Sequence, residues 1–388
     1  MESLGHHRPT WIEVHLEALR WNVAEVRRRI PPTTRLLAQV KSDAYGHGLV
    51  PVAQALAACG VDGFGVVSLE EAGRLRQAGL TQPILLQSVV EPSAAETVLA
   101  LDIWPTVCTV EFARALQRVA AAQRRLVPVH LKVDTGMGRL GVWHDEVDEF
   151  LTQLADCDAL QWEGCYTHLP SADDDPDFTR VQLATFARCV ARLRVQGFAF
   201  PLVHAANSIG IIAFPESHLT LVRPGVMLYG LYPATRLRAQ ITLAPALSWK
   251  SRIIFLKRVA AGRSISYGRT HVTSRPTTIA TVPVGYGDGY RRALSNRSAV
   301  LIGGQRVPVV GRVCMDHLML DVGHVTQVSV GDEVILIGSQ GDAQIAAEEL
   351  AVLAETIPYE IVTGITDRIP RRYLRTPLPA PLQAVGTR

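Results

Sequence analysis

One lysine in this chain stands where a protein can use an amine for chemistry. Lys41 directly follows an apolar run, residues 36–40, that has the composition of a buried strand, and a helical pattern begins near residue 49. An amine at such a strand-to-helix corner can act as a base or form a Schiff base once burial or nearby positive charge raises its neutral fraction. On position alone, a solvated surface lysine is the alternative.

Other polar residues follow later apolar runs in the same way. They are Arg139, His168, Asn207, Ser208 and Arg223. Because the carboxyl ends of parallel strands open on one face, we expect these side chains to converge with Lys41. The loops after the last two strands of such a barrel commonly hold phosphate, and Ser208, Gly225 and Val226 stand there. Taken singly, Ser208 could merely belong to a helix cap and Gly225 to a turn.

The strands and helices expected around these residues form a repeating pattern. Helical patterns separate eight apolar runs, which cover residues 36–40, 63–67, 84–87, 103–107, 127–133, 160–167, 202–205 and 219–226. Eight such units predict an α/β fold, a (β/α)8 TIM-type barrel rather than an open sheet. We place this barrel at residues 1–242, although an alternating strand at about 9–16 can pack on the following domain instead.

Beyond residue 242, short β-rich runs punctuated by glycines replace the helical periodicity. The runs are 247–260, 277–284, 299–302, 307–310, 319–322 and 333–337, with one helical pattern at 345–354. This change predicts a second, mainly β domain over residues 243–375, in preference to a single elaborated α/β domain. Residues 376–388 are rich in proline and are expected to form an extended tail.

The composition is that of a globular protein, since 48% of the 388 residues are hydrophobic, 19% are charged, and the formal net charge is only +3. Paired arginines are scattered along the chain, which argues against a nucleic-acid partner. The sequence shows neither an apolar leader nor a stretch long enough to span a membrane, so we expect a cytoplasmic protein. Six cysteines without a C-x-x-C pair predict reduced thiols rather than disulfides or a metal site.

The segment Lys-Ser-Asp-Ala-Tyr-Gly-His-Gly at residues 41–48 resembles the cofactor-lysine segment of the alanine racemases, which are fold-type III pyridoxal 5'-phosphate (PLP) enzymes. The resemblance implies that Lys41 bonds covalently to PLP and that Tyr45 contacts the phosphate of the cofactor. It extends over about residues 8–373, so it takes in both predicted domains.

Two further segments, residues 204–208 and 222–225, resemble the parts of these enzymes that hold the phosphate and the pyridine nitrogen. The resemblance places the phosphate site at Asn207, Ser208, Gly225 and Val226. It places Arg223 against the pyridine nitrogen, which arginine would hold unprotonated because it does not give up its own proton. The cofactor is then a weaker electron sink, which favours proton removal and return over transamination or decarboxylation.

The segment at residues 132–141 is also similar to one in these enzymes. By this likeness, Arg139 faces the phenolic oxygen of PLP and contacts the substrate, and His168 belongs to the cofactor site. The likeness also makes Lys132 a candidate for carbamylation, which no sequence can show.

Two segments of the β domain, residues 266–268 and 311–316, resemble those by which one subunit of these enzymes completes its neighbour's site. The resemblance implies a homodimer with shared active sites, in which Tyr267 is the second catalytic base. Racemisation needs bases on opposite faces of the α-carbon, which one lysine cannot provide. A phenol must become more acidic for this role, and Arg223 acting through His168 is a route to it. Without the resemblance, Tyr267 would be an ordinary turn residue and His168 a core histidine.

The resemblance also assigns the substrate entrance. It implies that Tyr286, Met315 and Asp316 contact the amino acid, and that Tyr359 touches the cofactor and helps to narrow the entrance. A narrow entrance walled by tyrosines favours a side chain the size of a methyl group. The glycines around Tyr286 do not predict a nucleotide-binding loop, because no lysine and no helical pattern follow them.

These likenesses together imply a PLP-dependent racemase that interconverts L-alanine and D-alanine, supplies D-alanine for peptidoglycan, and needs no metal. A racemase of the same fold with serine or broader specificity stays open, because Asp43 and the segment 169–171 depart from the common residues of the family. A PLP-binding protein without turnover is the other alternative, but such proteins usually lack the β domain that carries Tyr267.

Overall fold

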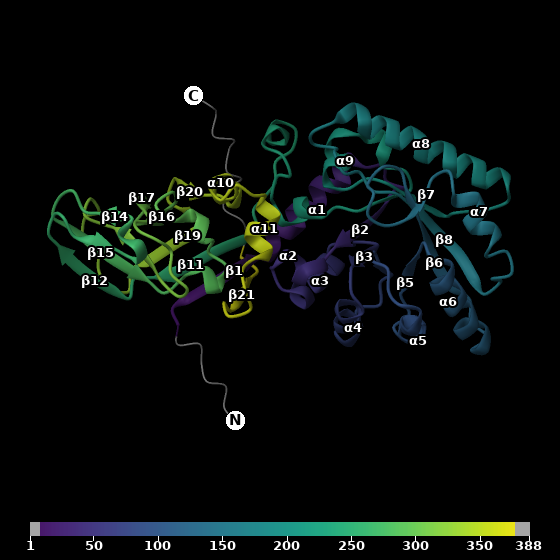
Figure 1. The fold of residues 1–388 in the computed structure, drawn as a ribbon, viewed down its shortest axis with the longest axis horizontal. Helices are drawn as coiled ribbons and strands as arrows, with labels where there is room; N and C mark the ends of the chain where they lie inside the picture. The colour runs from purple at the N-terminus through teal and green to yellow at the C-terminus, as the bar shows by residue number, and fades with distance from the viewer. Residues whose placement is uncertain (1–7, 377–388) are drawn as a thin grey trace.

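The computed structural model describes residues 8–376, which form two lobes (Figure 1). One lobe is a parallel barrel wrapped by helices, and the other is mainly β. Helix α11 (Pro358–Thr363) and strand β1 (Thr10–His15) lie where the two lobes meet. Nearly all of the predicted tail, residues 377–388, lies outside the described residues.

Eight parallel strands form the barrel. They are β2 (Arg35–Gln39), β3 (Gly63–Val66), β4 (Ile84–Leu86), β5 (Trp104–Val107), β6 (Val127–Asp134), β8 (Leu160–Tyr166), β9 (Leu202–His204) and β10 (Leu221–Val222). They pair in the order β10-β2-β3-β4-β5-β6-β8-β9, with the short strand β7 (Val142–Trp143) beside β6. Between β9 and β10, the amide of Thr220 donates to the carbonyl of Val203 at 3.1 Å. The barrel is therefore nearly closed, and the predicted (β/α)8 fold is confirmed.

Helices cover the outside of the barrel (Figure 1). They are α1 (Leu16–Arg29), α3 (Leu49–Ala58), α4 (Leu69–Gln77), α5 (Ala95–Ala100), α6 (Val110–Ala122), α7 (Val147–Thr152), α8 (Pro176–Val195) and α9 (Ser208–Ala213). Side chains of Ser68, Thr109 and Asp175 accept hydrogen bonds from free backbone N–H groups at the starts of α4, α6 and α8. The periodicity predicts neither α5 nor α9, because six residues are too few to show it. Within residues 8–376, no helix is long and apolar enough to cross a membrane.

The second lobe contains two main sheets, with strand orders β17-β16-β19-β11-β1-β21 and β12-β15-β18. The strands are β11 (Leu247–Arg252), β12 (Phe255–Val259), β15 (Thr277–Val282), β16 (Ala299–Ile302), β17 (Gln305–Pro308), β18 (Leu318–Asp321), β19 (Glu333–Gln340) and β21 (Arg371–Leu374), and helix α10 (Ala347–Leu353) follows β19 and β20 (Ala343–Ile345). Strand β1 pairs antiparallel with β11 and parallel with β21. The first strand of the chain thus joins the last one in the sheet of the β lobe.

The predicted run 247–260 is two strands rather than one. Strand β11 pairs with β19, whereas β12 pairs with β15 in the other sheet. At the corner, the amide of Ile253 donates to the carbonyl of Asp332 and the amide of Ile254 donates to that of Thr281, so the chain changes partner between adjacent residues. The alternation does not predict β13 (Ser264–Ile265) or β14 (His271–Val272), which have two residues each.

Apolar residues fill one end of the barrel interior. Trp104, Leu202 and Leu221 are the first residues of their strands, and they pack with Leu37 and Leu85. This apolar layer leaves the carboxyl ends of the strands as the place where polar side chains can face an open mouth.

Candidate active site

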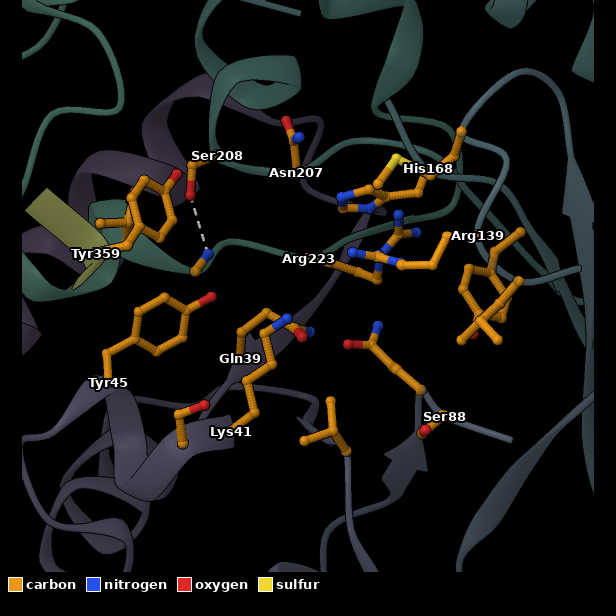
Figure 2. A pocket seen from close by; sticks show the side chains of 18 of the residues that line it. Gln39, Lys41, Tyr45, Ser88, Arg139, His168, Asn207, Ser208, Arg223 and Tyr359 are labelled. Atoms are coloured by element: carbon orange, nitrogen blue, oxygen red, sulfur yellow. Dashed lines mark hydrogen bonds between the residues drawn. The ribbon is translucent and has the colours of Figure 1, made fainter. Parts of the chain in front are cut away.

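A cavity of about 490 Å³ opens at the carboxyl ends of the barrel strands (Figure 2). It brings together the predicted residues Lys41, Tyr45, Lys132, Arg139, His168, Asn207, Ser208, Arg223, Gly225, Val226 and Tyr359. Tyr359 comes from α11 of the β lobe, and the others come from the barrel lobe. Most of the residues predicted to converge therefore do so within one chain.

Lys41 begins a left-handed turn. Within α2 (Lys41–Tyr45), the φ angles of Ser42, Asp43, Ala44 and Tyr45 lie between 51° and 55°. Residues other than glycine are strained in this region, at about 1–2 kcal/mol each. The turn holds Lys41 at the cavity while the chain reverses toward α3, so the surrounding structure must offset the strain.

Two carboxylates support this turn. Glu71 of α4 accepts hydrogen bonds from the amides of Ser42 at 2.6 Å and Val67 at 3.0 Å. Asp43 accepts from the first amide of α3 at 3.0 Å and from Arg74 Nη2 at 3.2 Å. The departure from asparagine at Asp43 thus adds an ion pair that an amide side chain would not form.

The amine of Lys41 has a lowered pKa. Burial is the largest cause, the charge of Arg139 adds to it, and Arg223 contributes further, while Glu71 opposes the shift. A larger share of Lys41 is therefore neutral than for an exposed lysine. This is the form that attacks a carbonyl carbon or accepts a proton.

The predicted phosphate site is a close-packed cup. The buried ring of Tyr45 stacks on Tyr229, with 4.8 Å between ring centroids. Ser208 Oγ accepts hydrogen bonds from the amides of Gly225 at 3.0 Å and Met227 at 3.4 Å. A Cβ on Gly225 would lie 2.4 Å from Tyr45 Oη, so a larger residue would displace this hydroxyl. Glycine is required here for close approach and not as a turn former.

Asn207 caps α9 at the edge of the cavity. Its Oδ1 accepts from the amides of Ile209 at 3.1 Å and Gly210 at 2.9 Å, and its Nδ2 donates to the carbonyl of Leu169 at 3.3 Å. The helix-cap interpretation of Asn207 is therefore present in the structure, and Asn207 also lines the cavity.

Arg223 is held by a chain of hydrogen bonds that runs into the barrel. It is buried, and its Nη2 donates to the carbonyls of Thr167 at 2.7 Å and Ala205 at 2.9 Å. Its Nη1 donates to His204 Nδ1 at 2.6 Å, and His204 Nε2 lies 3.0 Å from His130 Nδ1. Burial lowers the pKa of Arg223 to about 10, so it is charged at neutral pH.

The donor-only chemistry of arginine fixes both histidine tautomers. Nδ1 of His204 accepts from Arg223 and carries no proton, so its Nε2 carries the proton and donates to His130. Burial, with the charge of Arg223 added, lowers the pKa of His130 to about 3 and lowers the pKa of His204 well below its usual value, so both are neutral. The sequence prediction linked Arg223 to His168, but its hydrogen-bonded histidine is His204.

Lys132 lies deeper in the same cavity. Its Nζ sits 4.4 Å from the centroid of the Tyr166 ring, and burial, then Arg223 and Arg139, lower its pKa well below the usual value. Two residues further along the chain, Asp134 accepts hydrogen bonds from the three amides of residues 136–138 at 2.8–2.9 Å. This shapes the loop that carries the exposed Arg139 to the cavity mouth (Figure 2).

Helix α11 closes the cavity from the β lobe. The Tyr359 ring lies 6.1 Å from that of Tyr45, centroid to centroid. The backbones touch as well, since a Cβ on Gly46 would lie 2.3 Å from the carbonyl oxygen of Val362. The β lobe therefore helps to place the lysine turn.

Four predicted residues do not line this cavity: Tyr267, Tyr286, Met315 and Asp316. They lie on the β lobe, where Tyr267 is 70% exposed and Met315 is 53% exposed. A single chain thus gathers the predicted cofactor residues but not the predicted second base.

Residues 14–233 match the sequence model of the alanine racemase N-terminal domain, and residues 246–373 match that of the C-terminal domain. The chain belongs to the alanine racemase family. An alanine racemase of Symbiobacterium thermophilum is 48% identical over 372 residues, which are 96% of this chain and 98% of the relative. One from Halothermothrix orenii is 45% identical over 94% of this chain and 97% of its own.

Solved alanine racemases share the whole fold. The Bacillus anthracis enzyme, crystallised with bound L-Ala-P, has a TM-score of 0.90 at 37% identity, with 95% of this chain and 96% of that one covered. The Clostridium difficile 630 enzyme in complex with cycloserine has a TM-score of 0.87 at 34% identity over the same shares. Family membership confirms the resemblance, the barrel-plus-β fold and the enzyme class expected from the sequence.

The alanine racemase resemblance does not single out several cavity residues. They include Gln39, Val67, Gln87, Ser88 and Tyr166. Val67 and Gln87 directly follow β3 and β4, and Tyr166 ends β8. The rule that selected Lys41, a position at a strand's carboxyl end, would have found these residues too.

Proposed function

We propose that this protein interconverts L-alanine and D-alanine with PLP held in the barrel cavity. The observation that carries the proposal is that Lys41 and Arg223 line the same cavity. Lys41 is a half-buried amine with a lowered pKa, and Arg223 is buried and charged. An amine that bonds to the cofactor and a donor that holds the ring nitrogen unprotonated are what PLP-dependent racemisation needs.

The residues present fit PLP. The close approach of Gly225 to Tyr45 places the Tyr45 and Ser208 hydroxyls together at the cavity wall, where they would hold the phosphate, and Asn207 and Val226 border them. Arg223 would then face the ring nitrogen, and Arg139 the phenolic oxygen and the carboxylate of the substrate. When bound, PLP supplies an electron sink that makes the proton on the substrate α-carbon acidic.

Two bases are proposed to move that proton. Lys41 acts at the α-carbon from one face. Burial raises the pKa of Tyr45 and Tyr359, and raises the pKa of Tyr166 to about 12, so these cavity phenols are poor proton acceptors. We assign the opposite face to the exposed Tyr267 of a second copy of this chain, with Tyr286, Met315 and Asp316 of that copy around the substrate. This makes the protein a homodimer with shared sites.

Carbamylation of Lys132 is part of the proposal. A neutral amine reacts with carbon dioxide, and the lowered pKa of Lys132 favours its neutral form. The carbamate is negative, and the nearby Arg139 and Arg223 would stabilise it. It would also give Arg139 a fixed anionic partner, which orients the guanidinium toward the cofactor.

Chiral chromatography of L-alanine incubated with protein and PLP tests the function. The proposal predicts progress to equal amounts of the two enantiomers, whereas Lys41→Ala should give no D-alanine. The same assay with L-serine shows whether the specificity is broader. Absence of D-alanine with wild-type protein that has bound PLP would overturn the proposal. A supply of D-alanine for peptidoglycan would follow from this activity.

A further inference from the structure

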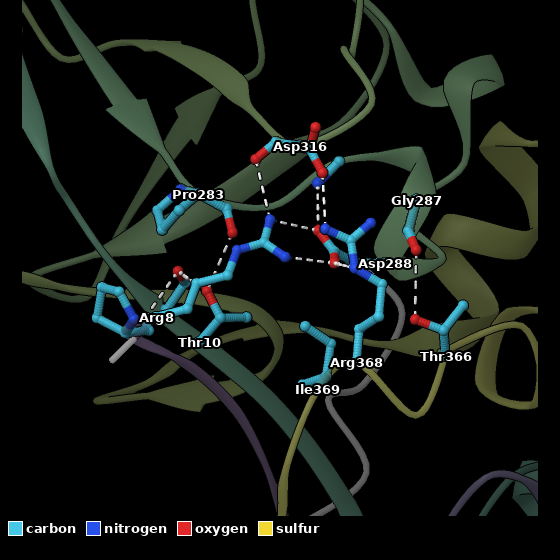
Figure 3. Close-up of polar contacts among 12 residues, drawn as sticks. Arg8, Thr10, Pro283, Gly287, Asp288, Asp316, Thr366, Arg368 and Ile369 are labelled. Carbon is cyan, nitrogen blue, oxygen red and sulfur yellow. Dashed lines mark hydrogen bonds and ion pairs between the residues drawn. The ribbon is translucent and has the colours of Figure 1, made fainter. Parts of the chain in front are cut away.

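Two loops of the β lobe that carry the proposed entrance residues are joined to each other. The amide of Tyr286 donates to the carbonyl of Cys314 at 2.9 Å, and the amide of Gly287 donates to that of Met315 at 2.9 Å. Residues 285–289, called here the tyrosine loop, and residues 314–316, the methionine loop, therefore move as a pair. Figure 3 shows the polar contacts around Asp288 and Asp316 of these loops.

A fully buried carboxylate lies at the base of the tyrosine loop. Asp288 is 0% exposed. Arg8 Nη1 and Nη2 donate to its Oδ1 at 2.6 Å and Oδ2 at 2.7 Å, a bidentate pair, and the amide of Gly285 donates to Oδ2 at 2.9 Å. Arg368 Nε lies 3.6 Å from Oδ1. Both oxygens of Asp288 are thus matched by donors, as a buried charge requires.

The same two arginines also contact the methionine loop. Arg8 Nη2 donates to the carbonyl of Asp316 at 3.0 Å, and Arg368 Nη2 donates to Asp316 Oδ1 at 2.7 Å. Both arginines point toward Asp288 and Asp316 (Figure 3). Arg8 precedes β1 and Arg368 precedes β21, which are paired neighbours in the large sheet. One edge of that sheet therefore holds both loops.

We propose that Arg8 and Arg368 are positioning residues that set the width of the substrate entrance through Asp288 and Asp316. This inference rests on the proposed function, in which Tyr286 and Met315 border the substrate. Separating the loops from the sheet would leave the Asp288 charge buried without its partners, so the paired arrangement is strongly favoured. A rigid entrance discriminates a methyl side chain from a hydroxymethyl one, whereas a loosened entrance would admit both.

The experiment compares Arg8→Ala, Arg8→Lys and the control Arg372→Ala in the PLP-loaded protein. Arg372 lies on β21 and packs over the Trp11 ring at 4.6 Å, so it tests loss of a nearby arginine from the same sheet edge. KM and kcat are measured for L-alanine and L-serine. Arg8→Ala should raise KM for alanine roughly tenfold, within the ~100-fold that a 1 Å misplacement can cause. Arg8→Ala should also lower the alanine-to-serine ratio of kcat/KM. Arg8→Lys should partly restore KM for alanine and this ratio. Arg372→Ala should change neither KM nor the ratio.

Amide hydrogen exchange supplies a readout that does not depend on activity. Arg8→Ala should speed exchange in residues 285–289 and 314–316, and Arg372→Ala should not. If Arg8→Ala does not fold, Arg368→Gln takes its place, since that side chain is 46% exposed. KM, selectivity and exchange equal to those of the control would overturn the inference, even if the melting temperature falls. If wild-type protein racemises no amino acid, the proposed function fails, and exchange alone decides whether Arg8 holds the loops.

Discussion

At the scale of single residues, the cavity gathers cations without matching carboxylates. Lys41, Lys132, Arg139 and Arg223 line it, and its described lining residues include no aspartate or glutamate. Such a site favours anions, as the phosphate of PLP and the carboxylate of an amino acid are. Burial and the neighbouring arginines also lower the pKa of both lysines. The groups that would bind the anions therefore help to keep the amines neutral.

Lys132→Met should stabilise the cofactor-free protein at neutral pH, because the buried amine has a strongly lowered pKa in the folded state. The unfolded chain holds this proton up to about pH 10.4, whereas the folded chain releases it at lower pH. Stability of the wild-type protein from this residue therefore rises with pH in that window, by up to about 1.4 kcal/mol per unit. Denaturant unfolding in carbon-dioxide-free buffer should show the advantage of the variant shrinking from about pH 7 to about pH 10. A constant advantage would contradict this.

The histidine chain behind Arg223 allows a matched pair of substitutions. His130→Leu leaves the Nε2 proton of His204 without an acceptor and should cost about 1–3 kcal/mol of unfolding free energy. His130→Asn can keep an acceptor oxygen near the place of Nδ1 and should cost less. With PLP bound, the leucine variant should also form more pyridoxamine per turnover, because the His204 ring that accepts from Arg223 Nη1 loses the partner that fixes its far side. Equal unfolding free energies and equal pyridoxamine formation in the two variants would show that the acceptor on His130 contributes to neither.

At the scale of elements, the sequence predicts the repeating strands and helices of the barrel, but it does not predict short helices or strained turns. The barrel strands lie in apolar runs that alternate with helical patterns, so their number and order are readable even where a strand has only two or three residues. The left-handed turn at Ser42 to Tyr45 is not, because its support by Glu71 comes from another element and no local signal marks it. Helix α11 has only six residues, which are too few to show a helical period. Tyr359 is therefore predicted through the family resemblance alone.

Glu71→Gln tests the support of that turn. Glutamine has one acceptor oxygen where Glu71 uses two, so the amide of either Ser42 or Val67 loses its partner. We expect a loss of about 1–3 kcal/mol in unfolding free energy and a lower kcat as Lys41 shifts. Glu70→Gln is the control, because Glu70 is exposed and one position away. A loss in both variants alike would assign the effect to the charge of α4 and not to the turn.

At the scale of the whole molecule, the proposed reaction groups are divided between lobes (Figure 1). The barrel carries Lys41 at the cavity, and the β lobe carries Tyr267, whose side chain is exposed. Phe255 and Val272 on the same lobe are also about half exposed, at 51% each, as expected for a surface that a partner covers. In the proposed mechanism, each complete site therefore needs two copies of the chain, which no pattern within one sequence reveals without the family resemblance.

Mixing two inactive variants tests whether two chains share each active site. Lys41→Ala and Tyr267→Phe homodimers should each be nearly inactive, because every site lacks one base. After subunit exchange, about half of the dimers are mixed, and one of the two sites in each combines intact Lys41 with intact Tyr267 from the partner. About a quarter of wild-type activity should therefore return. No recovery, with exchange demonstrated independently by a mass-tagged subunit, would contradict the shared site and the role of Tyr267.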